Sequence, residues 1–536
     1  MQRLRYIVLA FYWMGWGMAI ATLPARGQSG NQSDITGPNP IEIITNPDPD
    51  ESESPTTETT TNPPTNTPNN PTTSTQNSSE RNEDSSSSSV SASTAGEVDR
   101  LAYETQLQQA STGEAVQLLE EYQALDFCNH LKLERCGKVP TLEQIVDLLN
   151  QSWQETGEKS SFIYITSSQE SIEILAIFPT DPNLQKQSFD DGEIINQAIV
   201  RTRVPNISKS LIRKTVKKLR RDITNVRRTS PIYLNPAQKL YQWIVAPLTE
   251  ELRERNIDTL VFSLDTGLRL IPMSALHDGE NFLLEKYNVA IVPSFGLVDL
   301  GYSDIRTMPL LAMGATQFTN QTPLPAVELE LEAISQKSWE SKIFVDSEFT
   351  VTNFMTENLA NPFGIIHLAT HGEFKSGDLE NSYIQFADRP INLFELRQIA
   401  QSLGWTDGDR PLIELFVLSA CQTAVGDESA ELGFAGLAIQ LGVKSVVASL
   451  WRVSDIGTLA LMGEYYQQLE GSPLKARALR LAQLKLLTGE TYIADGTLHF
   501  SNGRSIVLPP ELRAQTNINL THPFFWSSFM TIGNWN

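Results

Sequence analysis

Two apolar segments that each end in reactive side chains decide the fold of this chain. Residues 364–372 read GIIHLATHG, and residues 412–423 read LIELFVLSACQT. Each is a nearly continuous apolar run, as is typical of a strand that is buried on both faces of a parallel sheet. Histidine and cysteine follow at the carboxyl ends of these runs, which is where open parallel sheets form their sites. The sequence therefore predicts a buried parallel sheet with a site beyond these two strands.

The chain around these two segments alternates between apolar strands and amphipathic helices. Strands separated by helices are typical of α/β domains, in which helices cover both faces of the sheet. We therefore predict an α/β fold with a mainly parallel sheet flanked by helices. Further strands are expected at 259–264, 289–292, 310–314, 343–345 and 445–450, with a helix at 327–335.

A helical and hairpin segment is expected at 97–235, before the main domain at 236–536. Apolar residues have helical spacing over 97–153, and a β-hairpin is predicted from about residue 161 to 177. The basic stretch from Lys209 to Arg228 has two interpretations, a binding face or the solvated side of an amphipathic helix. A loop-rich insertion is expected at 488–519.

The first 96 residues have the composition of a targeting segment followed by a linker. Residues 1–27 combine a basic start, an apolar run and small residues before position 28, which predicts a secretory signal peptide. An uncleaved membrane anchor is the alternative, and it is the only membrane contact we expect. Residues 28–96 are rich in Ser, Thr, Asn and Pro, and we interpret them as a disordered linker. Either way, the rest of the chain is expected outside the cytoplasm, periplasmic or secreted.

Charge and cysteine content narrow the function classes. Residues 1–27 carry +3 and residues 28–96 carry −9, which leaves −16 of the total −22 on residues 97–536. We expect no nucleic-acid partner, because neutralisation of phosphates by basic side chains supplies most of that affinity. Three cysteines exclude a disulfide-built scaffold. Cys128 and Cys136 either close a small disulfide loop or remain two free buried thiols.

His371 and Cys421 are the candidate catalytic residues. If their strands are neighbours, the two side chains emerge side by side, and the imidazole can activate the thiol as a nucleophile. The amides of Gly372 and Cys421 would then stabilise the oxyanion. The alternative is structural, because a cysteine at a strand end is usually a small core residue and a histidine after a strand is usually a loop residue.

These segments also resemble the signature of the CHAT family, caspase-like domains related in fold to caspases and separases. The resemblance includes Glu328 and Glu330, which match an "ELE" helix, and it runs in family order from about residue 237 to 535. The matching motifs are 367–372 HLATHG, 418–426 LSACQTAVG, 264–273 LDTGLRLIPM, 449–455 SLWRVSD and 522–526 HPFFW.

The resemblance implies endopeptidase activity with a Cys/His dyad, in which His371 is the base and Cys421 the nucleophile. The helical repeats common in the family are missing, so repeat-mediated partner binding is not implied. No cofactor is expected. His367 and His371 are four residues apart, but their segment has the pattern of a strand and turn, so we expect no metal site. We expect His367 either to be a core residue or to support the residues of the site from behind.

Acidic residues near the motifs are candidates for a specificity pocket. Asp455 directly follows a strand end and would favour a basic side chain before the scissile bond, with Trp451 as an apolar wall. Asp427 and Glu428 lie close to the cysteine motif, but solvated loop acids are the simpler interpretation. Trp451 has a core role as its alternative.

The function predicted from the sequence is a secreted or membrane-tethered caspase-like cysteine endopeptidase that cleaves a protein or peptide substrate. The alternative is a non-catalytic CHAT module that acts in interaction or sensing. A metallohydrolase is a third and more distant interpretation.

Overall fold

The fold is described from a computed structural model. It describes residues 100–133, 136–180, 197–227, 230–335, 339–375, 377–406, 413–419, 422–423, 428–513 and 518–536. The signal segment and the linker expected at 1–27 and 28–96 lie outside these residues, as do Ala420, Cys421 and Asp427.

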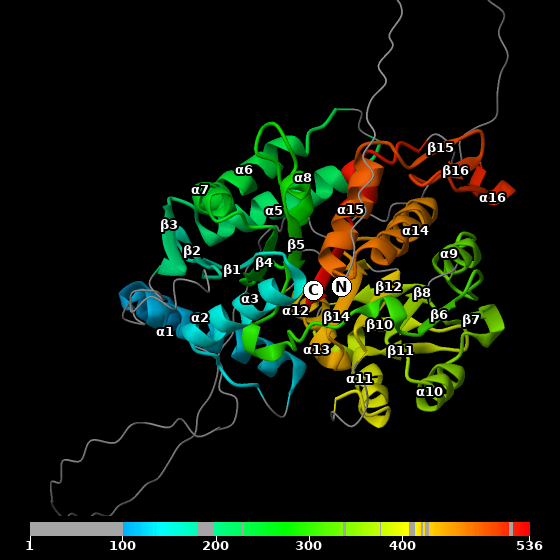
Figure 1. Ribbon diagram of the computed structural model, residues 1–536, viewed down its shortest axis with the longest axis horizontal. Helices are drawn as coiled ribbons and strands as arrows, with labels where there is room; N and C mark the ends of the chain where they lie inside the picture. The colour runs from blue at the N-terminus through cyan, green and yellow to red at the C-terminus, as the bar shows by residue number, and fades with distance from the viewer. Residues whose placement is uncertain are drawn as a thin grey trace, which may run out of the picture. The chain divides into compact units, whose positions relative to one another are not determined.

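A long mixed sheet lies at the centre of the described chain (Figure 1). Over the described residues it has eleven strands, in the order β3-β2-β1-β4-β5-β18-β14-β12-β8-β6-β7. The strands are β1 (Ser160–Ser167), β2 (Ser171–Ile177), β3 (Ile199–Pro205), β4 (Thr259–Leu264), β5 (Asn288–Ile291), β6 (Leu310–Gly314), β7 (Ser341–Val345), β8 (Ile365–Ala369), β12 (Leu415–Ser419), β14 (Ser445–Ser449) and β18 (Phe529–Gly533).

The sheet consists of two mainly parallel halves that run in opposite directions. β1, β4, β5 and β18 are parallel to one another, and β14, β12, β8, β6 and β7 form the second parallel set. The halves meet where β14 pairs antiparallel with β18, from Ser445 opposite Gly533 to Ser449 opposite Phe529. The predicted α/β class with a mainly parallel sheet is confirmed, whereas the change of direction had no counterpart in the sequence analysis.

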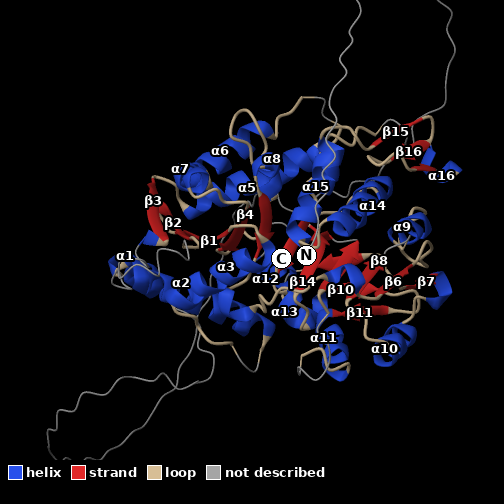
Figure 2. Ribbon diagram, in the orientation of Figure 1, coloured by secondary structure: helices blue, strands red, loops and turns tan. Residues whose placement is uncertain are grey.

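Helices cover both faces of this sheet (Figure 2). On one face lie α5 (Lys209–Thr224), α6 (Leu234–Ile244), α7 (Thr249–Glu254), α8 (Leu283–Lys286), α9 (Val327–Ile334), α14 (Asp455–Gly471), α15 (Lys475–Leu487) and α17 (Pro523–Trp526). On the other lie α1 (Arg100–Gln109), α2 (Thr112–Leu131), α3 (Leu142–Thr156), α10 (Val351–Ala360), α11 (Leu393–Ser402), α12 (Glu428–Ala435) and α13 (Leu437–Leu441). Short 3₁₀ turns are η1 (Ala246–Leu248), η2 (Met273–Ala275), η3 (Phe295–Leu297), η4 (Ile305–Thr307), η5 (Asp346–Glu348) and η6 (Leu379–Asn381).

Strand β1 shows how the N-terminal segment joins the core. Its alternate side chains point to opposite faces, as the two-residue period of a strand requires. Phe162 and Tyr164 pack in the cluster that contains residues of α1, α2 and α3, whereas Ile163 and Ile165 pack in the main cluster with α5 and α6. Since β1 also pairs with β4, one sheet crosses the boundary expected at 235/236.

Side-chain caps start the helices that matter for the site. The Ser208 hydroxyl accepts from the amide of Leu211 at the start of α5, and the Ser454 hydroxyl accepts from the amide of Gly457 at the start of α14. Serine is among the preferred residues at this position because it satisfies an otherwise unpaired backbone donor. Ser454 therefore ends the turn after β14 and places Asp455 in the first turn of α14.

Two small sheets lie outside the large one. The insertion expected to be loop-rich contains a three-stranded antiparallel sheet of β15 (Tyr492–Ala494), β16 (Thr497–His499) and β17 (Ser505–Val507), followed by α16 (Pro510–Arg513). Strands of three residues are shorter than the runs from which strand patterns are identified. The other sheet has the order β11-β10-β9-β13 and comprises β9 (Gly372–Phe374), β10 (Tyr383–Gln385), β11 (Pro390–Asn392) and β13 (Gln422–Thr423).

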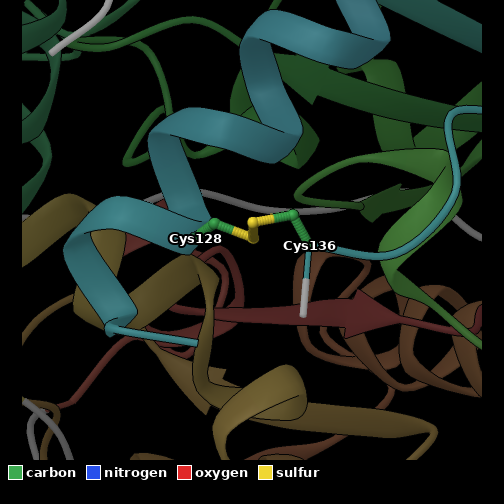
Figure 3. The surroundings of a disulfide bond; sticks show 2 residues. All are labelled: Cys128 and Cys136. Carbon is green, nitrogen blue, oxygen red and sulfur yellow. A yellow bond between two sulfur atoms is a disulfide. The ribbon is translucent and has the colours of Figure 1, made fainter. Parts of the chain in front are cut away.

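A disulfide closes the turn that follows α2 (Figure 3). Cys128 in the last turn of α2 is bonded to Cys136, and their Cα atoms are 5.5 Å apart.

Over the described ranges, no helix has both the length and the apolar composition needed to cross a bilayer.

Candidate active site

The two strands that carry the histidine and cysteine motifs are neighbours in the large sheet. β8 and β12 are parallel, and their register places Ala369 opposite Ser419 at the last pair. Both chains therefore leave the sheet at the same edge. Their polar extensions start from adjacent positions, as the sequence analysis required.

The extensions of β8 and β12 pair again in the four-stranded sheet. Glu373 in β9 lies opposite Gln422 in β13, and these two strands are parallel. Cys421 itself lies outside the described residues. The described positions on either side of it, Ser419 and Gln422, pair with Ala369 and Glu373, which lie on either side of His371.

His371 is held by a loop that the sequence analysis did not single out. Its Nε2 lies 2.8 Å from the carbonyl oxygen of Thr322. Since a carbonyl can only accept, Nε2 carries the proton, and Nδ1 is the basic nitrogen of the neutral ring. The ring of Phe318 packs edge-on against the imidazole, with 4.7 Å between ring centroids.

The environment of His371 keeps its imidazole neutral. Burial lowers its pKa below the ordinary value of 6.5, the hydrogen bond to Thr322 acts in the opposite direction, and the charge of Arg452 lowers the pKa further. Burial and a nearby like charge both disfavour the protonated ring. At neutral pH the imidazole is therefore a proton acceptor.

The amide of Gly372 faces the side on which β13 lies. The amide of Gln385 in β10 donates to the carbonyl of His371 at 2.8 Å, so these two residues form the hydrogen-bonded pair of the antiparallel ladder. The next pair, Gly372 opposite Ile384, then directs its backbone groups away from the partner strand. The amide of Gly372 is therefore not used in the hydrogen bonds between β9 and β10.

A fully buried polar cluster joins the two strands directly beneath the site. The Glu330 Oε1 atom of α9 lies 3.0 Å from Nε2 of His367 and accepts from the Ser419 hydroxyl at 2.5 Å. Nδ1 of His367 lies 3.1 Å from the Tyr466 hydroxyl of α14. Ser419 and His367 precede Cys421 and His371 on the same chains, so the cluster couples the two strands and orients their ends.

His367 therefore has the core role that we expected. Both of its ring nitrogens have protein partners, and within the described chain no group of three His, Cys, Asp or Glu side chains could hold a metal ion.

The sequence of the chain matches the CHAT domain family over residues 234–534, more than half of its length. The chain belongs to the CHAT family. Its α/β fold, with a mainly parallel sheet between two layers of helices, is the fold class that the resemblance to this family implied.

Solved structures with low sequence identity match parts of this CHAT protein. The separase–securin complex of Saccharomyces cerevisiae has 10% identity and a TM-score of 0.38, and the match covers 82% of this chain and 34% of that chain. The complex of the pro- and mature domains of RgpB from Porphyromonas gingivalis has 8% identity and a TM-score of 0.32, with 61% and 77% covered. The CHAT protein thus spans about a third of the separase chain. None of the curated proteins matches it.

Asp455 and Trp451, the two candidate residues of the specificity pocket, lie in different surroundings in the CHAT domain. Asp455 accepts a hydrogen bond from the amide of Ala326, the residue before α9, at 3.0 Å between N and Oδ2. Burial raises the pKa of its carboxyl to about 7, against the opposing effect of the Ala326 amide. Arg452 acts electrostatically on both Asp455 and His371. These two residues follow the parallel strands β14 and β8, so both lie beyond the same edge of the sheet.

Trp451 is a core residue in the described structure. It is 6% exposed, and its indole nitrogen donates to the carbonyl of Phe524 at 3.2 Å. The guanidinium carbon of Arg220 lies 5.6 Å from the centre of its ring. Of the two acids beside the cysteine motif, Asp427 lies outside the described residues and Glu428 begins α12.

Sequence reasoning missed the residues that hold His371 and join the two motif strands. Glu330 was noted only as part of a motif, and Thr322 and Phe318 had no signal because a backbone carbonyl and a loop aromatic have no fixed spacing to the motif. Tyr466 lay hidden in an apolar helix. An acid and a histidine in otherwise apolar segments, Glu330 and His367, were the one available indication, since buried polar groups need partners.

Proposed function

We propose that this CHAT protein is a cysteine endopeptidase in which Cys421 is the nucleophile and His371 the general base and acid. The observation that carries the proposal is the pairing of residues on both sides of Cys421 with residues on both sides of His371. This register favours a thiol beside the imidazole, and the Thr322 carbonyl leaves Nδ1 as the nitrogen that can take its proton.

The proposed reaction follows from these groups. Nδ1 of His371 takes the Cys421 proton, and the thiolate attacks the carbonyl carbon of the scissile peptide. The amides of Gly372 and Cys421 stabilise the resulting oxyanion. The imidazolium, held by the Thr322 carbonyl, then gives its proton to the leaving amine, so the C–N bond breaks and a thioester remains. Water, deprotonated by His371, hydrolyses the thioester and restores the thiol.

Asp455 is the proposed source of specificity. Its carboxyl lies at the same edge as His371, and burial holds its pKa near 7. A basic side chain of the substrate would favour the ionised form and pair with it. We therefore propose a preference for Lys or Arg before the scissile bond.

An extracytoplasmic location completes the proposal. The predicted signal segment at 1–27 supports it, and so does the disulfide between Cys128 and Cys136, because disulfides persist in oxidising compartments. Whether the signal segment is cleaved or anchors the protein is decided by sequencing the N-terminus of the mature protein.

Labelling with an electrophilic thiol probe tests the dyad without knowledge of the substrate. The chain has three cysteines, and two of them form the disulfide, so Cys421 is the single thiol available. We expect Cys421→Ala to abolish labelling and His371→Ala to slow it by about 10²-fold or more. The matched control is His499→Ala in β16, which should leave the rate unchanged.

An equal labelling rate in wild type and His371→Ala would contradict the proposal, because it would identify an ordinary exposed thiol. That result would favour the non-catalytic interaction or sensor module. Activity lost on addition of a chelator would instead favour the metallohydrolase.

A further inference from the structure

The largest basic feature of the chain has no role in the proposed peptidase reaction. Residues 209–228 contain nine Lys and Arg residues and one acid, Asp222, although residues 97–536 together carry −16. Helix α5 occupies most of this stretch. Its apolar face, with Ile212, Val216, Leu219 and Ile223, is buried in the core.

The other side of α5 lines a cavity of about 450 Å³. Lys214, Lys217 and Arg221 line it from the helix, and Gly267 and Glu431 complete the wall from the turn after β4 and from α12. A volume of this size is typical of a small-molecule site. The basic stretch therefore lines a cavity in addition to forming a solvated face of the helix.

Hydrogen bonds hold together the wall of the cavity that Gly267 and Glu431 form. The amide of Gly267 donates to Oε2 of the buried Glu431 at 2.6 Å, and Arg213 donates to the Thr266 carbonyl at 3.2 Å. Gly267 has a φ of +88°, and a Cβ there would lie 2.3 Å from Nε of Arg213. The missing side chain thus lets the Arg213 guanidinium cross the turn and reach the cavity.

The cations of the cavity are in excess over its acids. Lys218 and Arg221 share Asp222, whereas no carboxylate of the described residues pairs with Lys214 or Lys217. Bases that converge on a concavity without matching acids attract an anion, and Arg and Lys together are the usual ligands of phosphate.

We infer that this cavity binds a small anionic ligand that carries phosphate groups. A long polyanion is disfavoured, because outside the cavity it would meet a chain of net charge −16. A small one escapes that repulsion, because screening limits it to about 8–10 Å at moderate salt.

The cavity also contacts the element that follows the cysteine motif. Glu431 belongs to α12, which begins at Glu428, seven positions after Cys421. A ligand bound at Lys214 and Lys217 therefore acts next to the helix that continues from the proposed catalytic loop. Binding itself does not depend on the peptidase proposal.

Calorimetric titration with inorganic tripolyphosphate tests the site on the full-length protein. We expect a dissociation constant below 1 mM at low salt that weakens at least several-fold between 50 and 200 mM NaCl. Lys214→Gln/Lys217→Gln should weaken binding about tenfold or more. The control is Lys138→Gln/Lys239→Gln, which removes two exposed charges elsewhere and should bind as wild type.

Two further ligands show which chemical group the cavity recognises. ATP with an affinity equal to that of tripolyphosphate would support recognition of the phosphate chain, and tighter ATP binding would support a nucleotide. Binding of a Glu-rich peptide without binding of tripolyphosphate would overturn the inference. So would absence of tripolyphosphate binding at 10 mM, or equal affinity in the Lys214→Gln/Lys217→Gln variant and its control. Because the readout is heat of binding, failure of the peptidase proposal would leave this result unchanged.

Discussion

His371 is a residue whose environment fits its proposed role. The carbonyl of Thr322 fixes the tautomer, Phe318 covers one side of the ring, and burial lowers the pKa. A base must be unprotonated at the working pH. Burial favours the neutral ring, and the hydrogen bond to Thr322 leaves the lone pair on Nδ1.

The pKa of His371 can be tested by NMR titration of the imidazole Cε1–H signal. In the Cys421→Ala variant, where no thiol couples to the ring, we expect a pKa below 6.5 because burial disfavours the charged form. Arg452→Gln removes a repulsive charge and should raise this pKa by a few tenths of a unit, less at high salt. A titration at or above 6.5, or no change on removal of Arg452, would contradict this account.

The pKa of Asp455 predicts a pH-dependent stability. The carboxyl has a pKa of about 7 in the folded protein and 3.8 in a free reference. Its contribution is therefore fully present below about pH 4 and is lost as the pH rises through 7. Asp455→Asn cannot ionise, so the melting temperature of the variant should gain on that of wild type between pH 5 and pH 8. Thermal unfolding at both pH values measures this, with the exposed Asp147→Asn as control; an equal difference at both would count against it.

Glu330 acts at the scale of elements, because it joins three of them directly and a fourth through His367. It extends from α9 to His367 of β8 and Ser419 of β12, and His367 in turn contacts Tyr466 of α14. The ends of the two motif strands are thus tied together within the core. His371 and Cys421 each come two residues after the end of one of these strands.

Removal of Glu330 should destabilise the protein and disturb the dyad together. Glu330→Ala leaves the Ser419 hydroxyl and the His367 ring buried without this partner, which should lower the free energy of unfolding by about 2–4 kcal/mol. Glu330→Gln keeps an acceptor and should cost less. Urea unfolding measures the loss, and the thiol-labelling rate should fall in parallel.

The matched control is Glu328→Ala, which removes an exposed carboxylate from the same helix and should change the free energy of unfolding by less than about 0.5 kcal/mol. A similar small effect for Glu330→Ala would show that the cluster does not hold the strands.

The whole molecule is organised by the continuous sheet. The family match begins at residue 234, yet β1 pairs with β4 along six residues, and Glu120 of α2 accepts from Ser294, Phe295 and Gly296. Arg100 of α1 forms an ion pair with the buried Asp265. Burial alone would raise the pKa of Asp265, but Arg100 holds it well below its usual range. The segment before residue 234, with helices α1 and α2 and strand β1, is therefore part of the structural core.

A chain that starts at residue 234 should fail to fold as a soluble monomer. It would expose the edge of β4 and its apolar face, which favours edge-to-edge association, and it would leave Asp265 buried without its guanidinium partner. We expect aggregates on size-exclusion chromatography, whereas residues 97–536 should elute as a compact species with cooperative unfolding. A soluble, cooperatively folded 234–536 fragment would contradict this view.

Much of the fold was predictable from the sequence because its signals are local. The strands at 259–264, 310–314 and 445–450 and the helix over the basic stretch follow from hydrophobic period and length. The histidine and cysteine motifs followed from reactive residues at the ends of apolar runs. The acidic character of the chain follows from its composition alone.

Other features were decided only by tertiary structure, because they join distant positions. The Thr322 carbonyl lies 49 positions from His371, Glu330 lies 89 from Ser419, and Gly267 lies 164 from Glu431. The reversal between β18 and β14 also depends on pairing between remote segments. Backbone carbonyls have no residue signature, and a buried carboxylate is identified as a partner only when the packed core brings it to its histidine and serine. The candidate dyad could thus be identified from the local sequence, whereas the residues that support it are determined by long-range packing.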